Sequence, residues 1–213
     1  VFNVDFVNNS ESNVPFTKVD LEDFGDSIEV VSEIDDRING IDAVIHQAAI
    51  PASGLEANHK TFKSNTLSTY NIFQASKVMK INNIVWASSE TVLGLPFDTY
   101  PPYVPVDEEY YPRPESSYSL SKVMGEEMAR QYCRRNTEMK IFGLRYSNIM
   151  EECDYKQFQS FQHDPFLRKW NFWGYIDARD VAQACLLAME SKLKGADIFI
   201  IAADDTVMEE DNK

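Results

Sequence analysis

The sequence predicts an α/β protein built on a doubly wound parallel sheet. Short apolar runs alternate along the chain with longer amphipathic stretches, which is the order that successive β-α-β units produce. The central runs, such as IVWA at 84–87, are apolar at consecutive positions. Strands have that composition when helices cover both faces of their sheet.

The N-terminal part of the chain predicts three strands and a helix. VFNVDF at 1–6 opens the chain as a strand, and FTKVDL at 16–21 is a weaker second candidate. DSIEVVSEI at 26–34 has the apolar spacing of a helix. IDAVIH at 41–46 predicts a buried strand, and the small residues of QAAIPASG after it predict a turn.

The middle of the chain predicts two long helices, one on either side of a strand. Residues 56–79 carry apolar side chains at helical spacing, and NNIVWASS at 82–89 is the next buried strand. Residues 94–114 are rich in proline and tyrosine, so we expect them to be irregular. Helical periodicity returns over residues 115–135.

The C-terminal part completes the alternation. MKIFGLRY at 139–146 predicts a strand, and the aromatic-rich residues 149–174 predict an irregular segment. ARDVAQACLLAMESK at 178–192 has the pattern of a helix, and ADIFIIAA at 196–203 is a final strand. No internal repeat or low-complexity linker interrupts this order.

Composition restricts the partners that the chain can have. Its 213 residues are 44% hydrophobic, enough for a well-buried core. The formal net charge of −14 disfavours nucleic acid and anionic membranes as partners. No apolar run is long enough to span a bilayer, so we expect no membrane association. Acidic pairs such as Glu126 and Glu127 are interpreted as a solvated surface.

The cysteines and histidines give no sign of a metal site. The three cysteines are widely spaced, odd in number and without a CxxC pair, and His46, His59 and His163 lie far apart. We therefore expect no metal. Free cysteines used as small apolar residues favour a reducing compartment, and the expected location is the cytoplasm.

The stretch SSYSLSK at 116–122 carries the first sign of chemistry. It places Tyr118 and Lys122 four residues apart, a spacing that brings two side chains to the same face of a helix. A nearby ammonium favours the phenolate and typically lowers a pKa by about 1–3 units from about 10. Tyrosine could then act as a general acid and base near neutral pH. An isolated YxxxK is more often a pair on a solvated helix face.

Polar residues follow several of the predicted strands. DF comes after the first strand, HQAA after the strand at 41–46, SSE after IVWA and RYSN after KIFGL. Because ligands bind beyond the carboxyl ends of parallel strands, these groups are expected along one rim of the sheet. That convergence supports a functional interpretation of the Tyr118–Lys122 pair.

Six stretches share their order and spacing with the motifs of one family. PVDEEYYPRPESSYSLSK at 105–122 follows PxxExxPxxPxSxYxxSK, and WASSETVLG at 86–94 is similar to SSSxxVYG. The other four are VIHQAA at 44–49, SNTLSTYNIFQA at 64–75, LRYSN at 144–148 and WGYIDARDVAQA at 173–184. The chain thus resembles the extended short-chain dehydrogenase/reductase family, in its branch of NAD-dependent nucleotide-sugar epimerases and dehydratases.

The resemblance implies a Rossmann-like fold and a proton-transfer site. Tyr118 would exchange the proton of a sugar hydroxyl while a hydride moves between that carbon and the nicotinamide. Lys122 would lower the pKa of the phenol and hold the nicotinamide ribose, and Ser89 would hydrogen-bond the reacting oxygen. The alternative for Ser89 is a serine that merely ends a strand at a turn.

The resemblance also implies residues that contact NAD and the substrate. Asp5 would accept the hydroxyls of the adenosine ribose and favour NAD over NADP, although an aspartate after a strand is an equally common turn residue. The other residues implied to contact NAD are Asp20, Leu21, Ala48, Ala49, Asn65, Tyr118, Lys122 and Tyr146. The residues implied to contact the sugar are Ser89, Glu90, Thr91 and Asn148.

The chain departs from the family at its start. No GxxGxxG or GxGxxG occurs, and Val1 begins what resembles the second strand of the family. We therefore expect a fragment in which residues 1–148 form an NAD-binding domain without its first strand, and residues 149–213 a short substrate-side segment with a returning helix and strand. Loss of a central strand would split the sheet and expose edges on both sides of the gap. Such a piece is expected to bind NAD poorly.

The reaction stays open between three hypotheses. The first is an NAD-dependent epimerase or dehydratase of a nucleotide sugar. The short segment 149–174 favours the second, a dehydrogenase of a free sugar or sugar acid of the uronate type. Arg168 and Lys169 are interpreted as surface residues, with contact to an anion as the alternative. The third is a non-catalytic dinucleotide sensor. A homodimer through the helices at 56–79 and 115–135 is possible by analogy.

Overall fold

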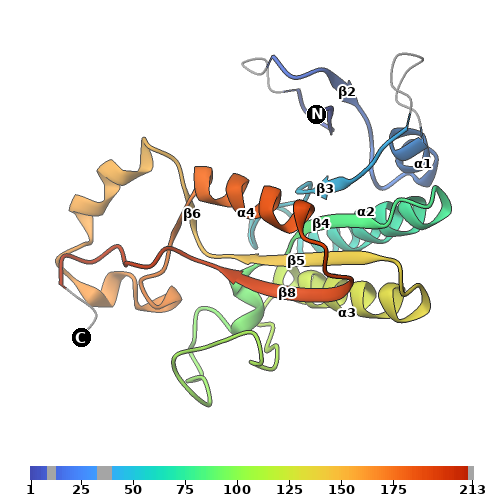
Figure 1. Cartoon of the computed structure of the whole chain (residues 1–213). Coiled ribbons are helices and arrows are strands. Elements are labelled where there is room, and N and C mark those ends of the chain that lie inside the picture. The colour runs from blue at the N-terminus through green and yellow to red at the C-terminus, as the bar shows by residue number, and fades with distance from the viewer. Residues whose placement is uncertain (9–12, 33–39, 211–213) are drawn as a thin grey trace.

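The computed structural model describes residues 1–8, 13–32 and 40–210, and it confirms the α/β fold class. A four-stranded parallel sheet forms the centre, with helices α2 and α3 on one face and α4 on the other (Figure 1). In spatial order its strands are β3 (Val44–His46), β4 (Asn83–Ala87), β5 (Lys140–Tyr146) and β8 (Gly195–Ile201). The three helices are α2 (Asn58–Val78), α3 (Ser117–Arg135) and α4 (Ala178–Glu190).

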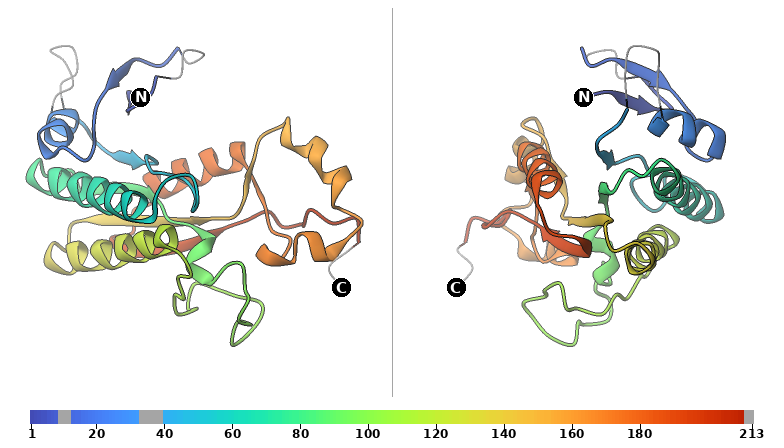
Figure 2. Two further views of the ribbon diagram at one scale, coloured as in Figure 1. Left: turned by 180° about the vertical axis from the view of Figure 1, so that it is seen from behind. Right: turned by 45° about the vertical axis from the view of Figure 1, so that its right-hand side comes forward.

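A second, two-stranded parallel sheet stands apart from the first (Figure 2). It pairs β1 (Asn3–Asp5) with β2 (Phe16–Lys18), and α1 (Phe24–Ser32) follows. The last two residues of the helix expected at 26–34 lie outside the described residues. Within the described part of the chain, no further strand pairs with the outer edge of β1 or of β3. The predicted split of the sheet is therefore present.

The central strand β5 is buried at all seven positions between β4 and β8, so its charged residues need partners inside the protein. Lys140 Nζ donates 2.8 Å hydrogen bonds to three carbonyl oxygens at the end of α4, those of Ala188, Met189 and Ser191. A lysine in this place satisfies carbonyls that the helix itself leaves free. It also ties the outer helix to the middle of the sheet.

The indole of Trp86 on β4 brings α3 close to the sheet. A methyl group added at Gly125 on α3 would lie 2.6 Å from Trp86 Cη2, and one at Gly143 on β5 would lie 3.0 Å from Trp86 Nε1. Only glycine leaves room for the ring at both positions. Phe73 of α2 meets the same indole edge to face, with ring centroids 5.9 Å apart. The packing fixes α3 beside the carboxyl end of β4.

The first turn of α3 is held by a capping box. Ser116 Oγ accepts a 3.0 Å hydrogen bond from the backbone N–H of Ser119, whose own hydroxyl oxygen accepts from Ser116 N at 2.9 Å. Such reciprocal bonds satisfy donors that a helix N-terminus would otherwise leave free. With Ser116 as the N-cap, the helix begins at Ser117, so Tyr118 lies in its first turn.

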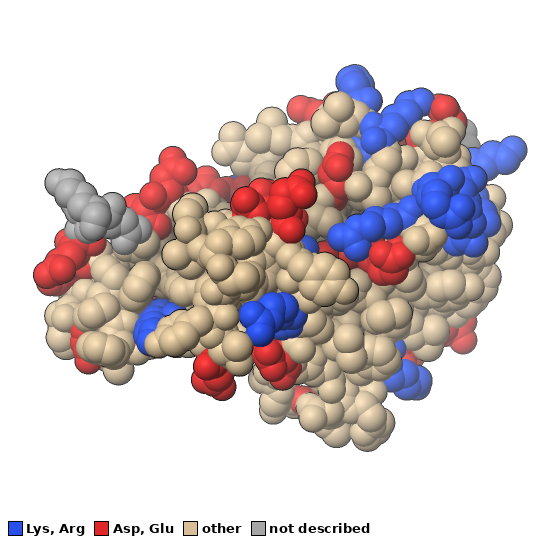
Figure 3. All heavy atoms as spheres, turned by 90° about the horizontal axis from the view of Figure 1, so that it is seen from below, with Lys and Arg blue, Asp and Glu red and all other residues tan. Residues whose placement is uncertain are grey.

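The aromatic-rich segment 149–174 is mostly irregular, as expected, but it includes a strand. β6 (Ile149–Met150) pairs with β7 (Ile176–Asp177), which leads directly into α4. Short 3-10 turns fill the interval: η2 (Asp154–Ser160), η3 (Pro165–Leu167) and η4 (Lys169–Asn171). Among the described helices, none combines the length and the apolarity that a bilayer crossing requires. From below, acidic and basic side chains are both present on the surface (Figure 3).

Candidate active site

Ser89 and Tyr118 meet where β4 ends and α3 begins. Ser89 is the N-cap of the 3-10 helix η1 (Glu90–Leu93), and its Oγ accepts hydrogen bonds from Thr91 N at 3.2 Å and Thr91 Oγ1 at 3.0 Å. The side chain of Ser89 lies near enough to the Tyr118 phenol to lower the pKa of that phenol. Both residues are more than nine-tenths buried. Two groups that lie 29 positions apart in the sequence thus share one interior site.

Lys122 lies on the next turn of α3. Its Nζ is 5.6 Å from the centroid of the Tyr118 ring and donates a 2.7 Å hydrogen bond to the carbonyl oxygen of Ala87. Burial lowers the pKa of Lys122 to about 8. The structure therefore brings Ser89, Tyr118 and Lys122 together, with the ammonium beside the ring and anchored to the end of β4.

The pKa of Tyr118 differs from the expectation. Burial raises it, the negative charge of Glu90 raises it further, and the hydrogen bond with Ser89 lowers it. The predicted lowering by Lys122 is wrong for this structure, because removing the phenol from water disfavours the phenolate more than its partners favour it. The phenol is therefore protonated at neutral pH.

Glu90 is a second titratable group beside Tyr118. Ser147 Oγ donates a 2.7 Å hydrogen bond to Glu90 Oε2, and the nearby side chain of Asn171 also favours the ionised carboxylate. Burial raises the pKa of Glu90 to about 7, against these hydrogen bonds and the charge of Arg168. The carboxyl group therefore changes its charge near neutral pH within the site.

The interpretation of Arg168 as a surface residue is wrong. Only 8% of it is exposed, and its guanidinium lies between two rings, 5.0 Å from the centroid of Phe161 and 5.1 Å from that of Trp170. Arginine stacks well on aromatic faces, and this contact takes it out of water. Lys169, in contrast, is exposed, as expected.

A cavity of about 530 Å³ opens beside β1 and β3. Five residues implied to contact NAD line it, namely Asp5, Asp20, Leu21, Ala48 and Ala49. Phe6 and Gln47 also line it and belong to the DF and HQAA stretches that were expected along the rim. No contact with NAD was predicted for the other lining residues, which are Glu22, Ile50, Glu56, Lys60, Ser64 and Ser68. Most of these belong to or precede α2, whose role in the cavity could have been inferred only from its packing.

The chemistry of this cavity fits one end of NAD. Carboxylate oxygens accept hydrogen bonds from ribose hydroxyls, and Asp5 and Asp20 are therefore suited to adenosine. The small side chains Ala48 and Ala49 leave their backbone accessible. Lys60 is the one basic residue of the lining, and it is paired with Glu56 at 2.7 Å. The lining thus fits the adenosine of NAD and offers little to a pyrophosphate.

Asp5 also has the contacts of a turn residue. Its Oδ1 accepts hydrogen bonds from Phe6 N at 2.6 Å and Val7 N at 3.2 Å. The two interpretations given for Asp5 are therefore compatible, because the same carboxylate shapes the turn and faces the cavity.

Asn65 and Tyr146 do not line the cavity. Asn65 Oδ1 accepts from Ile50 N at 2.8 Å and its Nδ2 donates to Ile50 O at 3.0 Å, so it holds the loop after β3. The Tyr146 hydroxyl contacts Cys185 Sγ at 3.1 Å and accepts from Gln47 Nε2 at 3.2 Å. Both residues support neighbouring elements.

The two remaining substrate candidates, Thr91 and Asn148, directly follow Glu90 and Ser147 in the sequence. Thr91 donates to Ser89 Oγ as described. Asn148 is partly buried after β5, and its carbonyl oxygen accepts from Ile176 N at 3.0 Å. Both positions border the group formed by Ser89, Glu90 and Ser147.

Sequence reasoning missed the partner of the Ser88 hydroxyl. Glu126, interpreted as surface, is fully buried, and its Oε1 accepts a 2.7 Å hydrogen bond from Ser88 Oγ. Arg145 of β5 binds the same carboxylate through Nε and Nη2, at 2.9 and 2.8 Å. The available signal was the position of Glu126 four residues after Lys122, on the same helix face.

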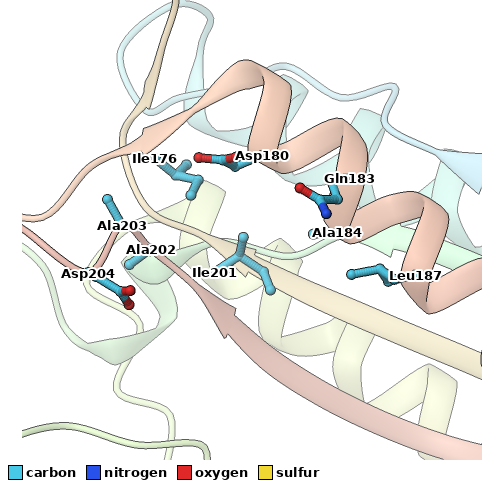
Figure 4. Close-up of a pocket in the computed structure, with 9 residues that line it drawn as sticks. All are labelled: Ile176, Asp180, Gln183, Ala184, Leu187, Ile201, Ala202, Ala203 and Asp204. Atoms are coloured by element: carbon cyan, nitrogen blue, oxygen red, sulfur yellow. The ribbon is translucent and has the colours of Figure 1, made fainter.

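Another hollow lies away from this group, between α4 and the end of β8 (Figure 4). No predicted site residue lines it. In the described residues, no group of three or more His, Cys, Asp or Glu side chains could hold a metal ion. His46 is buried, and burial together with the charge of Lys122 lowers its pKa to about 3, so the ring is neutral.

Comparisons with known proteins agree on the family. The model of the NAD dependent epimerase/dehydratase family matches residues 3–202. A putative UDP-glucose 4-epimerase of Methanocaldococcus jannaschii is 34% identical over 151 residues, 68% of this chain and 45% of that protein. The bifunctional UDP-glucose 4-epimerase and UDP-xylose 4-epimerase 1 of Pisum sativum is 30% identical over 142 residues, 66% of this chain and 38% of that protein. The chain thus spans less than half the length of these relatives.

Solved structures show the same fold. The UDP-N-acetylglucosamine 4-epimerase from Bacillus cereus superposes with a TM-score of 0.68 at 20% identity, over 95% of this chain and 69% of that one. The uronate dehydrogenase from Agrobacterium tumefaciens gives 0.71 at 19% identity, over 98% of this chain and 69% of that one. At these identities the likeness concerns the fold.

Proposed function

Because the chain belongs to the NAD-dependent epimerase/dehydratase family, we propose that Tyr118, Ser89 and Lys122 form the proton-transfer site of an enzyme that acts on a nucleotide-activated sugar. One observation carries the proposal. The three residues are buried together at the carboxyl end of β4: Lys122 Nζ lies 5.6 Å from the Tyr118 ring centroid and binds Ala87 O, and Ser89 lies near enough to lower the pKa of the phenol. In an open parallel sheet, that end of the strands is where ligands bind.

Tyr118 would move a proton to or from a sugar hydroxyl. The hydrogen bond with Ser89 favours the phenolate, and Lys122 supplies a positive charge beside the ring. Glu90 opposes the phenolate when it is ionised and ceases to do so once protonated. NAD, when bound, would accept a hydride from the carbinol carbon. Ser89 would share a hydrogen bond with the oxygen on that carbon and so orient it toward the phenol.

The cavity beside β1 would take the adenosine of NAD. Asp5 and Asp20 would accept the ribose hydroxyls, and their negative charge would disfavour the 2′-phosphate of NADP. Leu21, Ala48 and Ala49 would form the apolar and small part of the wall. These five residues come from β1, from the turn after β2 and from the loop after β3.

The direct test is conversion of a nucleotide sugar in the presence of NAD. We expect Tyr118→Phe to lower the rate about 100-fold or more, since a positioned general acid or base contributes about 10²–10⁴. Unchanged circular dichroism would show that the variant is folded. A non-catalytic dinucleotide sensor predicts no conversion by the unmodified protein, and conversion unaffected by Tyr118→Phe would contradict the proposal.

A sugar-acid dehydrogenase is the second candidate. The buried cation of Arg168, close to Glu90, could face a substrate carboxylate. The compact segment 149–174 agrees with a small substrate. NADH absorbance separates the two reactions, because an epimerase or a dehydratase restores NAD in each turnover. Steady accumulation of NADH with a uronate and no other acceptor would favour the dehydrogenase.

A homodimer through α2 and α3 is proposed for the quaternary state. The two helices pack side by side, and Tyr70, Leu120 and Met124 expose about two fifths of their surface on them. Apolar residues exposed on adjacent helices are suited to a helical interface. Sedimentation should give a dimer that Leu120→Glu converts to a monomer.

We propose a cytoplasmic location. The three cysteines are free, and Cys133 and Cys185 are buried. Free buried thiols suit a reducing compartment. Fractionation of cells that produce the full-length protein should recover it in the cytoplasm.

A further inference from the structure

Ser88, the residue before Ser89, is held by a buried charged group. Its side chain donates to Glu126 Oε1 at 2.7 Å, and only 2% of the residue is exposed. The same oxygen accepts from Arg145 Nε at 2.9 Å, and Oε2 accepts from Arg145 Nη2 at 2.8 Å. The side chains of Glu126 and Arg145 are almost completely buried. The hydroxyl is therefore bound to a carboxylate that has little freedom to move.

The end of β4 is tied to α3 at two consecutive residues. Lys122 binds the carbonyl oxygen of Ala87, and Glu126 binds the hydroxyl of Ser88. Lys122 and Glu126 follow Tyr118 at four and eight residues, so all three lie on the same helix face. The next residue of the strand end is Ser89, whose side chain lies near enough to Tyr118 to lower the pKa of the phenol.

A buried ion pair is weak evidence for stability, because desolvation of the two charges offsets much of their attraction. An apolar pair of similar size could fill the same space. What an apolar pair could not supply is an acceptor for the Ser88 hydroxyl. The buried carboxylate of Glu126 therefore has a role beyond packing, which is to accept the hydrogen bond of the Ser88 hydroxyl.

We propose that Ser88 is a positioning residue, which Glu126 and Arg145 hold so that Ser89 stays within hydrogen-bond reach of Tyr118. The inference rests on the proposed function for its meaning in catalysis. The structural effect that it predicts is limited to the contact between Ser89 and Tyr118. Loss of the Ser88 hydroxyl would free the strand end to rotate, and the Ser89 hydroxyl would leave the phenol.

The phenol of Tyr118 is the natural reporter. Three neighbours affect or approach it: Ser89 by its hydrogen bond, Glu90 by its charge and Lys122 beside the ring. Protein labelled with ¹³C at the tyrosine Cζ gives one NMR signal for each of the ten tyrosines. The signal that Tyr118→Phe removes is that of Tyr118. Its chemical shift at neutral pH reports the hydrogen bond without nucleotide or sugar.

The experiment is a double-mutant cycle on Ser88→Ala and Ser89→Ala. Each single variant should displace the Tyr118 signal in the same direction, Ser88→Ala by at least about half as far as Ser89→Ala. The double variant should show no further displacement, because Ser88 acts through Ser89. The signals of the other tyrosines should stay in place. Glu127→Gln, at the exposed neighbour of Glu126, is the matched control and should leave the Tyr118 signal unchanged.

Two results would overturn the inference. An unchanged Tyr118 signal in Ser88→Ala would show that Ser89 needs no such support. Additive displacements would show that Ser88 acts on the phenol by another route. Because no substrate is present, neither result bears on the proposed reaction. If the protein converts no nucleotide sugar but the two serine variants are non-additive, the proposed function is rejected and the positioning role of Ser88 is kept.

Discussion

The site has an α3 side, formed by Ser88, Ser89, Tyr118, Lys122 and Glu126, and a β1 side, formed by the cavity residues Asp5, Asp20, Leu21, Ala48 and Ala49. All five residues of the α3 side are buried, and the charged ones have partners inside the protein. On the β1 side only Leu21 is buried, and the two-stranded sheet has three residues per strand.

This difference in burial predicts that mutations on the two sides have different effects. A change on the α3 side leaves buried polar groups without partners, which costs free energy of folding. A substitution on the β1 side affects mostly side chains that are in part exposed to solvent. It should therefore change ligand affinity more than the free energy of unfolding. The following variants test this separation, beginning with the largest expected effect.

Glu126→Ala should lower the free energy of unfolding by about 3–5 kcal/mol, because it leaves Arg145 buried without its counter-ion. Urea unfolding measures the loss. Glu127→Ala, one position along the helix and exposed, should change stability by no more than about 0.5 kcal/mol. A loss below about 1 kcal/mol for Glu126→Ala would remove the distinction between the two sides.

Glu90, the neighbour of Ser89 on the α3 side, makes the stability of the protein depend on pH. Burial raises its pKa to about 7, so the folded protein keeps a proton that the unfolded chain loses near pH 4. This contribution to stability is complete below that pH and is lost as pH rises through 7. Glutamine has no titratable carboxyl group, so the Glu90→Gln variant lacks this dependence on pH.

The stability of Glu90→Gln relative to the unmodified protein should therefore increase by about 2 kcal/mol between pH 5 and pH 8. Urea unfolding across that range measures the change. A difference that is constant with pH would mean that Glu90 has an ordinary pKa.

Gly125→Ala should destabilise the protein by about 1–2 kcal/mol, because the added methyl group meets the Trp86 ring. The sign of this stability change is informative, because at an exposed helix position alanine is more stabilising than glycine by about 1 kcal/mol. Thermal unfolding measures it. Glu127→Ala, at an exposed position of the same helix, should stay within about 0.5 kcal/mol. A more stable Gly125→Ala would mean that α3 can move away from the sheet.

Asp5→Asn should leave stability within about 0.5 kcal/mol, because the amide oxygen can still accept from Phe6 and Val7. Its affinity for NAD should fall about tenfold, the effect of losing a hydrogen bond to a charged group. Titration calorimetry with NAD measures the affinity of the unmodified protein and of the variant. Asp23→Asn, at an aspartate that does not line the cavity, is the control. Equal affinities would restrict Asp5 to its role in the turn.

Local rules were enough to predict the arrangement of Tyr118 and Lys122, since helix spacing alone puts them on one face. The position of Ser89 followed from the order of strands, because parallel strands end at a common edge. The burial of Glu126 could not be predicted in the same way. Charged residues are rarely fully buried unless paired, and its partner Arg145 lies on another element.

The same limit explains Arg168 and the pKa of Tyr118. The rings that bury Arg168 are arranged by the irregular segment, whose path has no sequence periodicity. The sign of the pKa shift of Tyr118 depends on how much water its neighbours exclude. A spacing motif states which groups are close, and burial decides which of their effects is larger.

Among the residues that the structure describes, no strand pairs with the outer edges of β1 and β3, and these edges affect colloidal behaviour. The edge strand β3 presents backbone donors and acceptors, and Ile45 on it is 44% exposed, so copies of the chain could join edge to edge and precipitate. At neutral pH the charge of −14 opposes this by mutual repulsion. Near the isoelectric point of about 4.6 the repulsion disappears, and turbidity should be greatest there.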